Sequence, residues 1–170
     1  MILIIVIAFT PKLSFGQFEP TEAECALITK TITDEYRDIT RVISKGEIRV
    51  NDLSSGDLFQ IVMTRNQETF SFIIRGVNRH CFENDTQIIF YFRDGSSLQF
   101  DSQNKQNCES LLLVNMGGIY RNDDRYDNFL NQFLVGIMFK SSGGESHKLK
   151  IETPQTEMIQ EVFECLIVSE

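Results

Sequence analysis

The sequence predicts an α+β domain, mainly antiparallel β-sheet with a C-terminal helix and one or two further short helices. Segments rich in β-forming residues follow one another through short polar or glycine-containing turns, whereas parallel strands would need long crossovers. Helical periodicity is confined to the region after an N-terminal apolar run and to the last third of the chain. Helices on a face or edge of one sheet fit this order. A β-sandwich with added helices is the alternative.

The chain opens with an apolar run over residues 2–9, followed by Pro11 and small residues. This layout is typical of a secretory signal peptide, with Ser14 and Gly16 in the small-residue positions if cleavage precedes Gln17. We therefore expect a leader over residues 1–16, a single globular domain over 17–170, and a periplasmic or secreted location. A buried first strand is the alternative for the apolar run.

Capping residues mark the first and last helices. Thr21 and Glu24 have the spacing of a capping box, which predicts a helix reaching about residue 30. Thr153 caps and Pro154 opens the last helix. Apolar residues at positions 126, 129, 130, 133 and 134 form one helical stripe and predict a helix there.

The β-type segments lie between these helices and are separated by short turns. The expected strands span residues 39–44, 47–51, 58–65, 69–75, 87–93, 96–101, 109–116, 137–140 and 147–151. Four consecutive apolar residues over 111–114 indicate a strand that is buried on both faces.

Asp94-Gly95 lies between two of these runs, and this dipeptide is a strong signal for a two-residue hairpin turn. Such a turn pairs residues whose numbers add to 189. Ile88, Phe90 and Phe92 would then face polar residues at positions 97, 99 and 101. This half-apolar face needs a cover, and a helix of the same chain is the expected one. A small ligand or a partner protein is the alternative, which makes Ile88, Phe90 and Phe92 a candidate ligand face.

The four cysteines predict two disulfides, because an even number behind a leader is typical of an oxidising compartment. Three connectivities exist for four cysteines. Cys81 and Cys108 also add to 189, so the hairpin register would place them opposite each other. We therefore expect Cys81–Cys108 and, by elimination, Cys25–Cys165. Burial as four free thiols is the alternative.

Composition and charge limit the classes of partner. Hydrophobic residues make up 42% and charged residues 24%, which is typical of a globular domain. The 16 basic residues against 24 acidic ones give a net charge of −8, which argues against nucleic acid as a partner. No stretch of the sequence approaches the ~20 apolar residues of a transmembrane span.

The two histidines, His80 and His147, are the main candidates for chemistry. His80 adjoins Cys81, but neighbouring residues on a strand point to opposite faces, which argues against a Cys–His nucleophilic pair. A zinc set of His80, Cys81, Cys108 and Cys165 lacks a close-spaced pair of ligands. We therefore expect no catalytic residue, no metal and no cofactor.

Residues 80–167 combine an apolar segment, a polar strand, Thr153-Pro154 and a helix ending near Cys165. This arrangement, together with the leader ending over residues 14–17, resembles small exported proteins of unassigned function from Gram-negative bacteria. The resemblance implies export and points to no particular activity.

The leader, the acidic charge and the expected disulfides favour an exported, non-catalytic binding module, because the sequence carries no catalytic motif. Its ligand would be a protein or a small apolar molecule. The alternative is an extracytoplasmic hydrolase using His80 or His147, which requires these side chains to converge with a carboxylate in a cleft.

Overall fold

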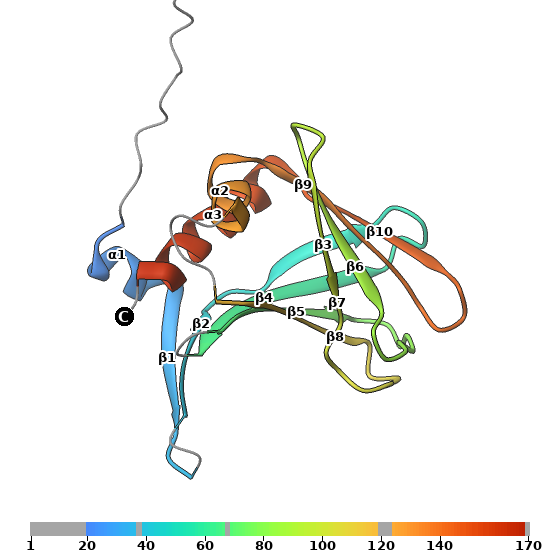
Figure 1. Ribbon diagram of the computed structural model, residues 1–170, viewed down its shortest axis with the longest axis horizontal. Coiled ribbons are helices and arrows are strands. Elements are labelled where there is room, and N and C mark those ends of the chain that lie inside the picture. The colour runs from blue at the N-terminus through green and yellow to red at the C-terminus, as the bar shows by residue number, and fades with distance from the viewer. Residues whose placement is uncertain (1–19, 37–38, 67–68, 119–123, 169–170) are drawn as a thin grey trace, which may run out of the picture.

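The computed structural model describes residues 20–36, 39–66, 69–118 and 124–168 (Figure 1). The expected leader over 1–16 lies outside these residues. The helices are α1 (Glu22–Ile28), α2 (Asp124–Asn131) and α3 (Thr153–Val168). The strands are β1 (Thr29–Asp34), β2 (Ile39–Ser44), β3 (Ile48–Asp52), β4 (Leu58–Asn66), β5 (Thr69–Gly76), β6 (Gln87–Phe92), β7 (Ser97–Asp101), β8 (Leu111–Gly117), β9 (Leu134–Lys140) and β10 (Ser146–Lys150). The predicted α+β fold with a mainly antiparallel sheet is confirmed.

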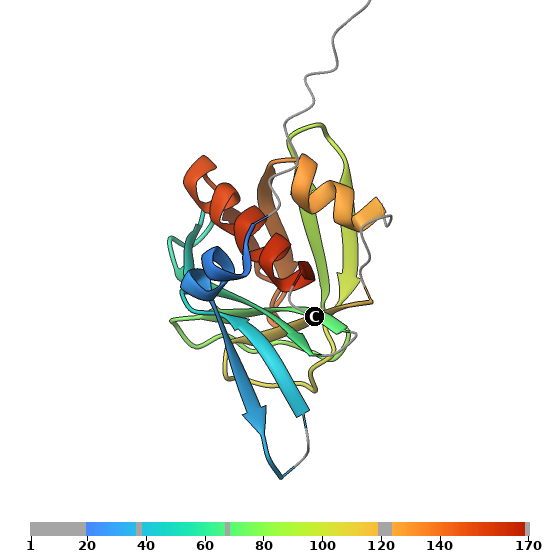
Figure 2. The ribbon, with the colours of Figure 1, turned by 90° about the vertical axis from the view of Figure 1, so that its left-hand side faces the viewer.

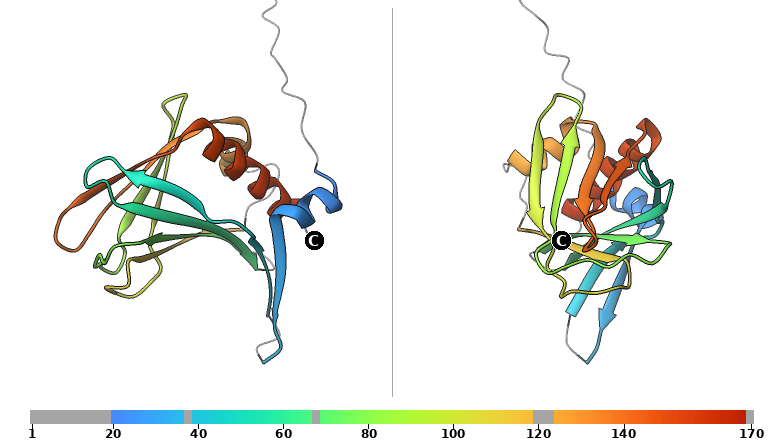
Figure 3. Two further views of the ribbon diagram at one scale, coloured as in Figure 1. Left: turned by 180° about the vertical axis from the view of Figure 1, so that it is seen from behind. Right: turned by 90° about the vertical axis from the view of Figure 1, so that its right-hand side faces the viewer.

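The strands form one antiparallel sheet that curves round on itself. On one side of β4 the order is β3, β10, β9, β6 and β7, and on the other side β5 is followed by β8. The two ends of this order meet at a bridge between Ser102 and Val114. The strands therefore enclose a core. β1 and β2 form a hairpin that projects from the body (Figure 3) and joins it where β2 pairs with the end of β4.

Helices α2 and α3 lie side by side against the curved sheet (Figure 2). Phe129 of α2 stacks on Phe163 of α3, with ring centroids 5.2 Å apart. Phe129 also packs on Phe90 at 5.6 Å and on Phe92 at 5.4 Å. With Ile88, both phenylalanines of β6 are buried in the core. Helix α2 of the same chain therefore covers the candidate ligand face, which is the cover that the sequence favoured.

The turn between β6 and β7 has three residues, 93–95, where the sequence predicted two. Gly95 takes the left-handed conformation, with φ +90°, that closes such a loop. The pairing therefore slips by one residue, so that Phe90 opposes Leu98 and Ile88 opposes Phe100. A slip of one residue exchanges the faces of a strand. Two apolar residues of β7 thus join the core-facing side instead of the polar residues expected there.

Both predicted disulfides are present. Cys25–Cys165 joins α1 to α3 across a sequence separation of 140 residues. Cys81–Cys108 joins the loop after β5 to the loop before β8. All four cysteines are bonded, as is typical of proteins in oxidising compartments.

The N-terminal end of the domain agrees with the sequence only in part. Thr21 and Glu24 form the predicted capping box. The helix then ends at Ile28, and β1 follows as an exposed strand that was not expected from the sequence.

Strand β8 alternates between buried and half-buried positions and is not buried on both faces. The prediction of a strand buried on both faces was therefore wrong. Across the described ranges, no helix is long and apolar enough to cross a membrane.

Candidate metal centre

Two side chains of the site come from the start of β10 and from the residue just before it. Glu145 and His147 lie two residues apart, and alternate residues of an extended chain point to the same face. The His147 side chain is buried, and Glu145 is exposed. One strand therefore presents an imidazole and, nearer to solvent, a carboxylate on the same side.

The third side chain, His80, comes from the connection between β5 and β6. Its ring centroid lies 4.7 Å from that of His147, and its side chain is 10% exposed. The loop is fixed from the other side by Ser110, whose hydroxyl accepts a hydrogen bond from the His80 N–H at 2.5 Å. The two histidines, far apart in sequence, are thus neighbours at one end of the curved sheet.

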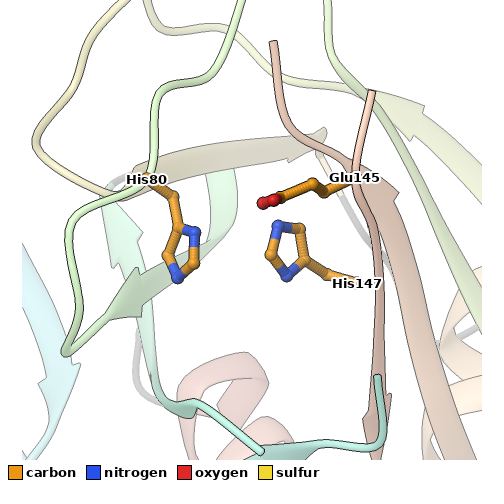
Figure 4. A group of neighbouring side chains, drawn as sticks. All are labelled: His80, Glu145 and His147. Carbon is orange, nitrogen blue, oxygen red and sulfur yellow. The ribbon is translucent and has the colours of Figure 1, made fainter. Parts of the chain in front are cut away.

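His80, Glu145 and His147 form a group suited to a metal ion. One atom from each, an imidazole nitrogen or a carboxylate oxygen, lies within 4.8 Å of the other two. Figure 4 shows one nitrogen of each ring turned toward the space beside the Glu145 carboxylate. Two imidazoles and one carboxylate are a common set of protein ligands at transition-metal sites.

Asp52, at the end of β3, fixes the His147 ring. Its carboxylate accepts hydrogen bonds from Nδ1 of His147 at 2.9 Å, the N–H groups of Lys148 and Ser54, and the Ser55 hydroxyl. Burial by itself would raise the pKa of Asp52, but these hydrogen bonds outweigh it and lower the pKa to about 2. Asp52 is therefore ionised at neutral pH and acts only as an acceptor.

This hydrogen bond sets the tautomer of His147. Because Asp52 can only accept, Nδ1 of His147 carries the hydrogen, and in a neutral imidazole Nε2 then holds the lone pair. Nε2 is buried and has no hydrogen-bond partner among the described residues. A buried polar atom without a partner costs free energy, so this nitrogen is available for a ligand.

A second carboxylate lies behind His80. Oδ2 of Asp57 is 3.2 Å from Nε2 of His80, within the range of an ion pair but off the line of a hydrogen bond. The amide of Asn78 donates to the other Asp57 oxygen. Metal-binding histidines usually donate their second N–H to a carboxylate, which orients the ring. Asp52 makes this contact in full, and Asp57 is placed to make it after a small rotation of the ring.

Aromatic rings enclose the two imidazoles. Phe59 stacks on His80 with ring centroids 5.5 Å apart. Phe139 stacks on His147 at 5.2 Å, and Phe82 lies 6.2 Å from His147. An apolar shell of this kind holds the ligand rings in place and limits the access of water to a metal site.

Both histidines are recognisable as candidates from the sequence, but the set of ligands they belong to is not. The zinc set considered from the sequence cannot form, because Cys81, Cys108 and Cys165 are in disulfides. Glu145, Asp52 and Asp57 were missed. For Glu145 a local signal exists, namely its position two residues before His147 at the start of a predicted strand. Asp52 and Asp57 bracket a Leu-Ser-Ser-Gly turn, and nothing in their local sequence indicates a role beside a histidine.

Comparison of the chain with known protein families, with characterised proteins and with solved structures finds no match.

Proposed function

We propose that this protein is an exported, non-catalytic binding module whose ligand is a divalent transition-metal ion, for which Zn²⁺ is the reference probe. His80, Glu145 and His147 bind the ion, and Asp52 orients His147. Two observations carry the proposal together: one ligand atom from each of the three residues lies within 4.8 Å of the other two, and Nε2 of His147 is buried without a hydrogen-bond partner among the described residues.

The charge of the site favours a cation. Asp52, Asp57 and Glu145 surround the two imidazoles, and within the described ranges no lysine or arginine side chain pairs with these carboxylates. A divalent cation offsets this negative charge and uses the free lone pair of His147. Imidazole ligands favour zinc, copper, iron or nickel over magnesium and calcium, which prefer oxygen ligands.

The spacing of the ligand atoms requires a modest closure. Ligand atoms in a tetrahedral zinc site are about 3.3 Å apart, given metal–ligand bonds of about 2.0–2.2 Å, whereas the three atoms here lie within 4.8 Å. Glu145 is exposed and follows a turn that contains two glycines, so its side chain supplies the movement. The His147 ring is already fixed by Asp52 and Phe139, and the His80 ring needs only the small rotation toward Asp57.

The hydrolase alternative uses the same histidines and is less well supported. A serine or cysteine hydrolase needs a hydroxyl or thiol within hydrogen-bond reach of the base. Nε2 of His147, the nitrogen that Asp52 leaves free, contacts no such group in the part of the chain that is described. The Asp–His pair is therefore better explained as a metal ligand with its orienting carboxylate.

Calorimetric titration of untagged, metal-free protein with Zn²⁺ tests the proposal. We expect one ion per chain for the wild type and at least about tenfold weaker binding for E145Q and for H80N, because each loses a ligand. E157Q is the matched control, since Glu157 is exposed on α3 and carries the same charge. Equal affinity of wild type and E145Q would contradict the proposal.

A further inference from the structure

His80 is the only one of the three proposed ligands that does not come from β10 or the residue before it. Glu145 and His147 are two residues apart, at the start of β10 and just before it, so the backbone keeps them close together. The geometry of the site therefore depends on how the loop after β5 places His80 against β10.

The loop is fixed on one side by the segment around Cys108. The Cys81–Cys108 disulfide links the residue after His80 to this segment. The Ser110 N–H donates to the His80 carbonyl at 3.2 Å, and Nε of Arg79 donates to the Cys108 carbonyl at 3.2 Å. The cross-link and these hydrogen bonds act on three consecutive residues, 79–81.

On its other side, Cys81 contacts the turn that carries Glu145. The Ser142 N–H donates to the Cys81 carbonyl at 2.8 Å, and the Glu145 carbonyl accepts from the Ser141 N–H at 2.9 Å in the same turn. Cys81 is thus bonded to Cys108 through its side chain and to the β9–β10 turn through its backbone.

We propose that the Cys81–Cys108 disulfide is the positioning group of the metal site, so that metal affinity depends on this bond being intact. The inference rests on the proposed function. With the disulfide present, His80 is held against β10 before the metal arrives. When a dithiol reduces it, Cys81 and Cys108 each gain a hydrogen and the dithiol closes to a cyclic disulfide. Metal binding must then order the loop itself, which weakens affinity.

The test is Zn²⁺ titration of three metal-free proteins: the wild type, C81S/C108S and C25S/C165S. The second pair is the matched control, because Cys25–Cys165 joins α1 to α3, and neither helix carries a proposed metal ligand. We expect about 10- to 100-fold weaker binding for C81S/C108S, the range for lost orienting contacts, and a change of less than about threefold for the control. Equal weakening of both double variants, or none in C81S/C108S, overturns the inference. A wild type that binds no Zn²⁺ contradicts the proposed function instead.

Two further measurements cover the remaining outcomes. If C81S/C108S does not fold, S110A keeps the disulfide but removes the hydroxyl that accepts from the His80 N–H. Weaker zinc binding by S110A supports positioning of His80 through this segment, and unchanged binding overturns it. The Co²⁺ absorption spectrum of the reduced wild type is the second readout. A sulfur-to-metal charge-transfer band would show that the freed thiolates join the site and would contradict the positioning role.

Discussion

Asp52 and His147 face each other across a 2.9 Å hydrogen bond, with their side chains 0% and 2% exposed. The two residues are 95 positions apart in sequence and meet where β3 pairs with β10. The ionised carboxylate keeps a hydrogen on Nδ1, and the other ring nitrogen is turned toward His80 and Glu145 (Figure 4). The contact thus connects the folding of the sheet to the chemistry of the proposed site.

Asp52 makes the stability of the domain depend on pH in a defined range. Its pKa is about 2 in the folded protein against an ordinary value of 3.8. Because folding lowers the pKa, the stabilisation is fully present above the ordinary value and is lost as pH falls toward the folded value. The difference between these two pKa values corresponds to about 2 kcal/mol of folding stability. Urea unfolding of the metal-free proteins measures this effect. The difference in free energy of unfolding between wild type and D52N should fall by about 2 kcal/mol between pH 5 and pH 2. A constant difference would contradict the assignment.

Gly76 should tolerate no side chain, because a Cβ there would lie 3.1 Å from atoms of His80, Phe59 and Ser110. We expect G76A to lower the free energy of unfolding by about 1–3 kcal/mol, as overpacking does, and to weaken zinc binding by displacing the His80 ring. Gly46 is the control, since a Cβ there meets no atom within 4 Å. G46A with the same loss in both assays would show that the effect at Gly76 is not local.

Phe129 closes the core over Phe90 and Phe92, so its removal should expose the face that the sequence suggested for a ligand. We expect F129A to lose about 3–5 kcal/mol of stability and to increase the fluorescence of a hydrophobic dye. M158A is the control, because Met158 is 46% exposed on α3. A stable F129A protein that binds no dye would contradict the role of α2 as the cover.

The two disulfides should differ in their effect on global stability. In the chain-entropy model, a bridge that spans 140 residues contributes about 5 kcal/mol and one that spans 27 about 3.5 kcal/mol. Guanidinium unfolding should therefore place C25S/C165S below C81S/C108S in stability. The reverse order would indicate that the shorter bridge constrains more than its own loop.

The fold class and most strands were predictable, because hydrophobic periodicity and turn chemistry are local signals. The Asp94-Gly95 hairpin shows what such local signals leave open. The dipeptide identifies a turn but does not distinguish a two-residue loop from a three-residue loop closed by Gly95. The slip of one residue places Leu98 and Phe100 on the core-facing side, where polar residues were expected.

The prediction of Cys81–Cys108 was correct, although the hairpin register on which it was based was wrong by one residue. Pairs in the β6–β7 hairpin add to 188, but the isolated bridge of Phe82 with Asn107 adds to 189. An irregular segment between them restores the register, so Cys81 and Cys108 lie next to that bridge. No local sequence signal predicts this compensation.

The candidate site was only half predictable. His80 and His147 stood out because the chain has two histidines. Their meeting depends on the curvature that brings the loop after β5 next to β10. Asp52 and Asp57 become orienting groups only through the pairing of β3 with β10 and the turn before β4. These contacts join segments that are far apart in the sequence, and periodicity along the chain does not predict them.

The most direct test of the metal centre is anomalous diffraction at the zinc absorption edge from crystals grown with one equivalent of Zn²⁺. The proposed site predicts a single strong peak about 2.0–2.2 Å from a nitrogen of His80, Nε2 of His147 and a carboxylate oxygen of Glu145. The hydrogen bond from Nδ1 of His147 to Asp52 should be retained. A peak at other side chains, or none at this group, would contradict the assignment of these residues as metal ligands.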